Sequence, residues 1–122
     1  MRRAGGTPLR LATKSLRVPG LIRYLLERDG FQGVFAYTLP EALYLHGKGF
    51  SDIVVGYPTT DRAALDELMH DEAAAATITL MVDSVEHLDY IDSIAGPQDR
   101  KTAAHCGYAS SSTRRTGYPV RR

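Results

Sequence analysis

The sequence predicts an α/β fold with parallel strands, and three observations lead to this prediction. Four short apolar runs typical of strands alternate with stretches in which apolar residues recur at helical spacing. The expected strand ends fall at Lys14, Tyr37, Tyr57 and Val82, which are 23, 20 and 25 residues apart. Each interval has room for one helix of about ten residues, which favours parallel pairing through right-handed crossovers.

The first unit contains the residue that is best suited to take part in a reaction. A strand is expected over Pro8–Thr13, in which leucines alternate with other residues, and Lys14 stands where that run stops. Pro19 and Gly20 then indicate a turn into a helix over Leu21–Arg28. By local sequence alone, Lys14 is a solvent-exposed lysine in a loop between a strand and a helix. A lysine at the carboxyl end of a strand, however, also lies where α/β folds place their active-site residues.

The second and third units repeat the pattern. A strand over Gly33–Tyr37 is nearly continuously apolar, as expected for a strand buried on both faces. Thr38 and Glu41 form a capping-box pattern at the start of the next helix. A third strand is expected over Asp52–Tyr57, followed by a helix over Arg62–His70.

The fourth unit leaves two architectures open. Ala73–Ala76 reads as a weak alanine-rich bridge before a strand over Ile78–Val82, and a cap at Asp83 or Ser84 starts the last helix. An open doubly-wound sheet and part of a (β/α)₈ barrel both fit four such units. The first turn has neither a G-x-G-x-x-G nor a G-x-x-x-x-G-K-[ST] motif, which weighs against a nucleotide-binding doubly-wound fold.

Composition bounds the class of protein. The 122 residues, 43% apolar and 24% charged, are enough for one globular domain. No apolar run approaches the roughly 18 residues that cross a bilayer, so no membrane partner is expected. A single cysteine, Cys106, excludes an internal disulfide framework and favours a cytoplasmic location.

Residues 96–122 differ in kind from the rest of the chain. They hold six Lys/Arg and one Asp, whereas residues 1–95 hold nine Lys/Arg and thirteen Asp/Glu. Ser110–Arg115 is a low-complexity run, and we expect the whole basic tail to be disordered. It lacks interleaved aromatic clusters and a helical frame, so no nucleic-acid partner is expected.

The other chemistry-bearing residues do not form a recognisable constellation. The four histidines are scattered without an i, i+4 pair, which argues against a zinc site; they are His46, His70, His87 and His105. Asp83 is expected to cap a helix, and Cys106 has no activating neighbourhood.

Residues from about Thr7 to Ile94 resemble a known family. LRLATKSLR, FQGVFAYTLPEALYLHGKGFSDIVVGYPT and ITLMVDSVEHLD are similar to the alanine racemase N-terminal-like barrel of pyridoxal-phosphate (PLP) enzymes of fold type III. The D-threonine aldolase, D-serine dehydratase and amino-acid racemase/deaminase group is the nearest. The resemblance implies a partial parallel (β/α)₈ barrel of about four units over residues 1–95.

The resemblance also implies a site. PLP would be the cofactor, an amino acid the substrate, and Lys14 the residue that forms the Schiff base with the cofactor. Tyr37 and Tyr57 lie at neighbouring strand ends and would line the same mouth, with Tyr57 as a cofactor-binding residue, although simple packing at the rim is the plainer role for both. Leu16 stands where the aldolase and dehydratase branch usually has histidine, which favours the racemase/deaminase-like branch.

Differences between this chain and the family pattern limit the activity that we expect. Four units are half of a barrel, and the loops after strands seven and eight, where barrels commonly bind phosphate, have no counterpart. The expected molecule is therefore a fragment that is inactive alone and that self-associates through open sheet edges. The alternative is a small doubly-wound binding module without catalysis.

Overall fold

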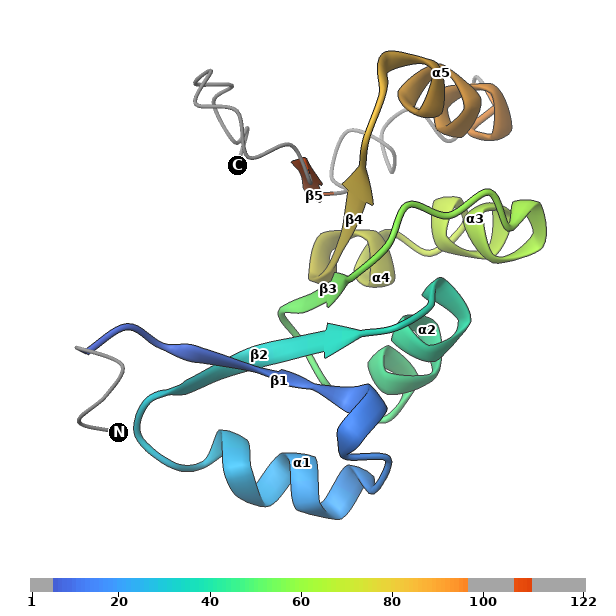
Figure 1. Cartoon of the computed structure of the whole chain (residues 1–122). Coiled ribbons are helices and arrows are strands. Elements are labelled where there is room, and N and C mark those ends of the chain that lie inside the picture. Colours follow the sequence, from blue (N-terminus) through green and yellow to red (C-terminus); the bar gives the residue numbers. More distant parts are fainter. Residues whose placement is uncertain (1–5, 97–106, 111–122) are drawn as a thin grey trace.

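The computed structural model describes residues 6–96 and 107–110, and these form an α/β fold around one parallel sheet (Figure 1). The five strands of the sheet are paired in the order in which they occur in the chain. All four pairings are parallel. The strands are β1 (Leu9–Ala12), β2 (Phe31–Ala36), β3 (Ile53–Val55), β4 (Ile78–Val82) and β5 (Gly107–Ser110).

Helices connect the first four strands, as the apolar spacing predicts. In Figure 1 the helices α1, α2, α3 and α5 follow one another around the lower and right-hand side of the strands. The helices are α1 (Pro19–Leu26), α2 (Leu39–Gly47), α3 (Arg62–Met69), α4 (Glu72–Thr77) and α5 (Val85–Ile94), with a 3₁₀ turn, η2, over Thr13–Ser15.

The strand order separates the two architectures that the sequence leaves open. A doubly-wound sheet contains a point at which the strand order reverses, because its helices cover both faces. The described strands run β1-β2-β3-β4-β5 without a reversal, so the doubly-wound arrangement is not the one adopted. The described strands form an open sheet with β1 and β5 at its edges.

The two faces of the sheet differ in burial. Leu11, Val34, Ile53 and Ile78 lie in register across four strands and are all buried. This row belongs to the apolar core that the strands share with the helices, which includes Ile22, Leu65, Leu68 and Ile91. Because side chains alternate along a strand, the next row belongs to the opposite face.

That opposite row is only half-buried. It consists of Ala12, Phe35, Val54 and Thr79, again in register across β1 to β4. The described sheet thus has one face in the core and one partly open face.

Side-chain caps start most of the helices. Thr38 Oγ1 accepts from Glu41 N, which confirms the predicted Thr38 cap of α2. Glu41 Oε2 reaches back one residue further than in a regular capping box and accepts from Tyr37 N. Asp61 and Asp71 cap α3 and α4 in the same way. Each bond satisfies a backbone N–H group that the helix itself leaves unpaired.

Three sequence-based expectations need correction. Of the two caps that the sequence offers for α5, Ser84 is confirmed, because its Oγ accepts from His87 N, and Asp83 is not the cap. The alanine-rich bridge lies within α4. Strand β1 ends at Ala12, so Lys14 lies in the following 3₁₀ turn and not directly at the strand end.

The tail also departs from expectation. Gly107–Ser110 forms β5, which pairs in parallel with β4 from Thr79↔Gly107 to Val82↔Ser110. The prediction of a disordered tail is therefore wrong for these four residues, and the sheet gains a fifth strand. The remainder of the tail, including His105, Cys106 and 111–122, lies outside the described residues. Within the described ranges, no helix combines the length and apolar character needed to cross a membrane.

Candidate functional site

The loops that follow β1, β2 and β3 meet at the carboxyl edge of the sheet, which is the edge formed by the carboxyl ends of the strands. They meet there because parallel strands have their carboxyl ends on the same side. A buried threonine shapes the first of these loops. Thr13 is 1% exposed, its Oγ1 donates to Phe35 O of β2 at 3.2 Å, and its carbonyl accepts from Leu16 N. The turn is thereby held against β2, and Lys14 is left exposed on its outer side.

Tyr37 and Tyr57 lie side by side at this edge. Their ring centroids are 5.2 Å apart and the ring planes are inclined by 66°, an edge-to-face contact. The Gly56 N–H donates to Ala36 O at 2.8 Å and so aligns the ends of β2 and β3. The two rings that the sequence predicts to be neighbours are in contact, and each is 52% exposed.

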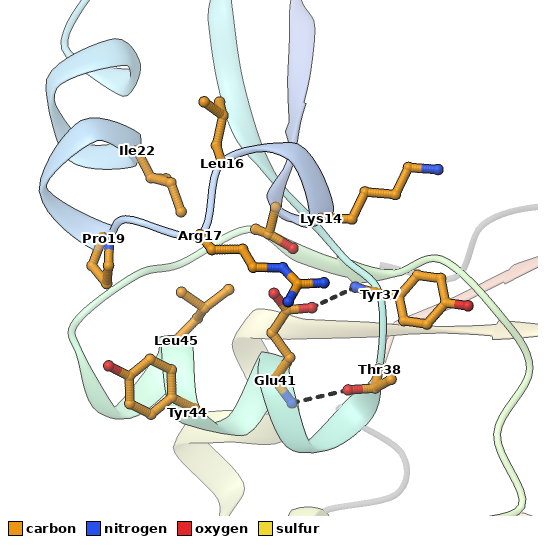
Figure 2. Close-up of a pocket in the computed structure, with 11 residues that line it drawn as sticks. Lys14, Leu16, Arg17, Pro19, Ile22, Tyr37, Thr38, Glu41, Tyr44 and Leu45 are labelled. Atoms are coloured by element: carbon orange, nitrogen blue, oxygen red, sulfur yellow. Dashed lines mark hydrogen bonds between the residues drawn. The ribbon is translucent and has the colours of Figure 1, made fainter.

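A hollow of about 330 Å³ lies between the η2–α1 segment and the start of α2 (Figure 2). Pro19, Ile22, Tyr44 and Leu45 line one end of it. The other end is polar and is lined by Lys14, Arg17, Tyr37, Thr38 and Glu41. In volume it matches the lower end of small-molecule sites, and its wall combines apolar surface with a few charged groups as such sites do.

The two cations at this edge point in different directions. Figure 2 shows the Lys14 side chain leaving the turn away from α1 and α2, on the side where the Tyr37 ring lies. The Arg17 side chain instead extends over the hollow toward Glu41. Neither cation forms a hydrogen bond or ion pair with any of the described residues.

A second cluster, which sequence reasoning missed, joins the β3–α3 loop to α5. His87 is 7% exposed and its Nε2 lies 2.7 Å from Thr59 O. Tyr90, one turn further along α5, donates its hydroxyl to Thr60 O at 3.0 Å. The sequence shows only an isolated histidine and tyrosine, because the carbonyls that they bind lie 28 and 30 residues away.

The ring of His87 is incompletely paired. Since Nε2 faces a carbonyl, it carries the proton, and Nδ1 is buried without a hydrogen-bond partner among the described residues. Asp83 Oδ1 lies 3.7 Å from Nδ1, too far for a hydrogen bond. In the described part of the chain, no three His, Cys, Asp or Glu side chains come together as a metal site would require.

The residues at the carboxyl edge of the sheet meet some, but not all, of the requirements for binding PLP. An exposed lysine amine with no described partner, beside two aromatic rings, suits a cofactor that is held through a lysine. Arg17 adds a second cation, but the loops after later strands that usually hold the phosphate have no counterpart among β1 to β5. Comparison with models of known protein families gives no match, and comparison with curated proteins gives none either.

Proposed function

We propose that this chain carries the leading strand–helix units of a PLP-dependent enzyme of fold type III, acting on amino acids as a racemase, aldolase or deaminase. The observation that supports this most is the position of Lys14. Its amine is exposed and has no described partner, at the carboxyl edge of a parallel sheet whose strands follow chain order. That is the edge at which such folds assemble their chemistry.

The residues have distinct roles in this proposal. Lys14 would hold the cofactor through Nζ, and its free amine would accept a proton from the substrate Cα. Bound PLP supplies an electron sink for the charge left on that carbon. Tyr57 would border the cofactor, and the edge-to-face contact with Tyr37 limits the positions that the Tyr57 ring can take.

We further propose that the chain has no turnover by itself and works in the cytoplasm as part of a larger assembly. Among the described strands β1 pairs only with β2, and the row Ala12, Phe35, Val54 and Thr79 is half-buried. An open strand edge is a template for strand addition, so a second copy could pair at β1. The single Cys106 in the sequence agrees with a reducing compartment.

The test is cofactor attachment at a single lysine. Purified chain is mixed with PLP, reduced with borohydride and digested, and the modified lysine is identified by mass spectrometry. We expect modification at Lys14 well above that at Lys48, whose amine lies over the Tyr44 ring on α2. Equal labelling of both lysines, or labelling unchanged in Lys14→Gln, would show that no specific site exists.

Activity is measured separately. The wild-type chain is expected to leave D- and L-amino acids unchanged over hours with PLP present. Turnover that disappears in Lys14→Gln would overturn the proposal of an inactive fragment while supporting the proposed family.

A further inference from the structure

We infer that the hollow between η2 and α2 binds a small zwitterion with a short apolar tail, such as an aliphatic amino carboxylic acid. The molecule would be held without a covalent bond and without PLP. Lys14 also lines this hollow, but its side chain extends away from it. The inference goes beyond the proposed function because it assigns binding to Arg17 and Glu41 and not to the Lys14 amine.

The first support is the pair of opposite charges over one hollow. Arg17 and Glu41 both line it, and Figure 2 shows the guanidinium extending toward the carboxylate. Within the described residues no ion pair joins the two groups, so each keeps capacity for a ligand. A guanidinium binds a carboxylate through two parallel N–H bonds, and a carboxylate accepts from an ammonium group.

The second support is that Glu41 is held in place by the fold. Its Oε2 accepts from Tyr37 N at 2.8 Å, and its own N–H donates to Thr38 Oγ1 at 3.3 Å. The carboxylate is therefore positioned before any ligand arrives, and its second oxygen stays available. Positioning in advance lowers the entropic cost of binding.

The third support is the division of the wall into two ends. Ile22 and Leu45 are 1% and 3% exposed and form an apolar floor, with Pro19 and the Tyr44 ring beside it. Arg17 and Glu41 lie at the other end. A ligand with both charges on one carbon and an aliphatic tail matches this division, whereas a phosphate would meet the Glu41 carboxylate and a purely apolar molecule would leave both charges unpaired.

The experiment uses a series of ligands that each lack one feature of leucine. Binding to the full chain is followed by NMR titration of the ¹⁵N-labelled protein, without PLP. Leucine is expected to shift the signals of residues around the hollow. 4-Methylpentanoate lacks the ammonium, isopentylamine lacks the carboxylate and glycine lacks the tail, and each should bind at least about tenfold more weakly.

Protein variants test the same assignment. Arg17→Gln and Glu41→Gln should each weaken leucine at least about tenfold, and Glu41→Gln keeps an oxygen that can accept from Tyr37 N. Arg62→Gln is the matched control, since Arg62 is an exposed cation on α3 that does not line the hollow. It should leave leucine affinity unchanged.

The outcomes separate this inference from the proposed function. Lys14→Gln should abolish specific PLP labelling and leave leucine affinity within about threefold, because a lysine that contributes only charge at the rim has a small effect. Absence of leucine shifts up to its solubility limit would overturn the inference. Equal affinity for leucine and 4-methylpentanoate would exclude the proposed role of Glu41 in binding the ammonium group. This comparison uses only the wild-type protein, so it stands even if the variants fail to fold.

Discussion

Arg10 of β1 and Asp52, immediately before β3, form an ion pair of 2.8 Å across the intervening strand β2. Arg10 also donates to the Asp52 carbonyl at 2.6 Å. Both contacts cross β2 at Gly33, where an added Cβ would overlap the Arg10 guanidinium and the Asp52 carboxylate. Three strands are thus joined at one point, and this arrangement makes two predictions.

Gly33→Ala should destabilise the protein by about 1–3 kcal/mol. Gly33 has a φ of +65°, which an L-residue rarely adopts, and the new methyl group would displace the Arg10–Asp52 pair. The measurement is urea unfolding followed by circular dichroism. The control is Gly20→Ala on α1, where nothing lies within 4 Å of the added Cβ, and which should stabilise by up to about 1 kcal/mol. Equal effects of the two substitutions would contradict this account.

The ion pair itself should contribute little. The Arg10 and Asp52 side chains are 31% and 43% exposed, so water screens them and the coupling energy should be only about 0.2–1 kcal/mol. A double-mutant cycle with Arg10→Gln and Asp52→Asn measures it. The coupling should fall further in 1 M salt, in which the Debye length is about 3 Å. A coupling that is large and insensitive to salt would refute the assignment of a screened pair.

The capping box of α2 should contribute measurably to stability. Thr38→Ala removes the acceptor for Glu41 N and should cost about 1 kcal/mol, seen as a lower Tm. Glu41→Gln keeps an acceptor for Tyr37 N and should cost less than Thr38→Ala. If Thr38→Ala left the Tm unchanged, the cap would not be formed in solution.

The contact between Tyr90 and the β3–α3 loop should hold that loop in place. Tyr90→Phe removes the bond to Thr60 O and should cost about 0.5–1.5 kcal/mol. Hydrogen exchange at the neighbouring Asp61 amide, which donates to Thr59 Oγ1, should become faster. Tyr44→Phe is the matched control, because the Tyr44 hydroxyl has no hydrogen bond to a described residue. Identical exchange in both variants would argue against the loop contact.

Local patterns in the sequence predict the elements well. The strand Ile78–Val82 forms with the expected bounds, and the helix expected over Arg62–His70 forms over Arg62–Met69. The capping pattern of Thr38 and Glu41 is also confirmed. These features depend on residues within about four positions of one another, so a linear sequence contains the information.

Contacts between distant segments are harder to predict. β5 lies in the basic tail that the sequence predicts to be disordered, and it forms by pairing along β4. His87 is buried because the β3–α3 loop folds over it and supplies the Thr59 carbonyl. Neither fact follows from the residues near 107 or 87.

The sequence by itself determined the alternation of strands and helices, the parallel α/β class and the placement of Lys14, Tyr37 and Tyr57 after successive strands. Only the tertiary structure decided the sequential strand order, the partly open sheet face and the hollow that brings Arg17 and Glu41 together. The physical reason is the separation along the chain over which each kind of interaction acts. Side-chain periodicity and caps act over one or two turns, whereas strand order and shared cavities depend on how distant segments pack to bury apolar surface.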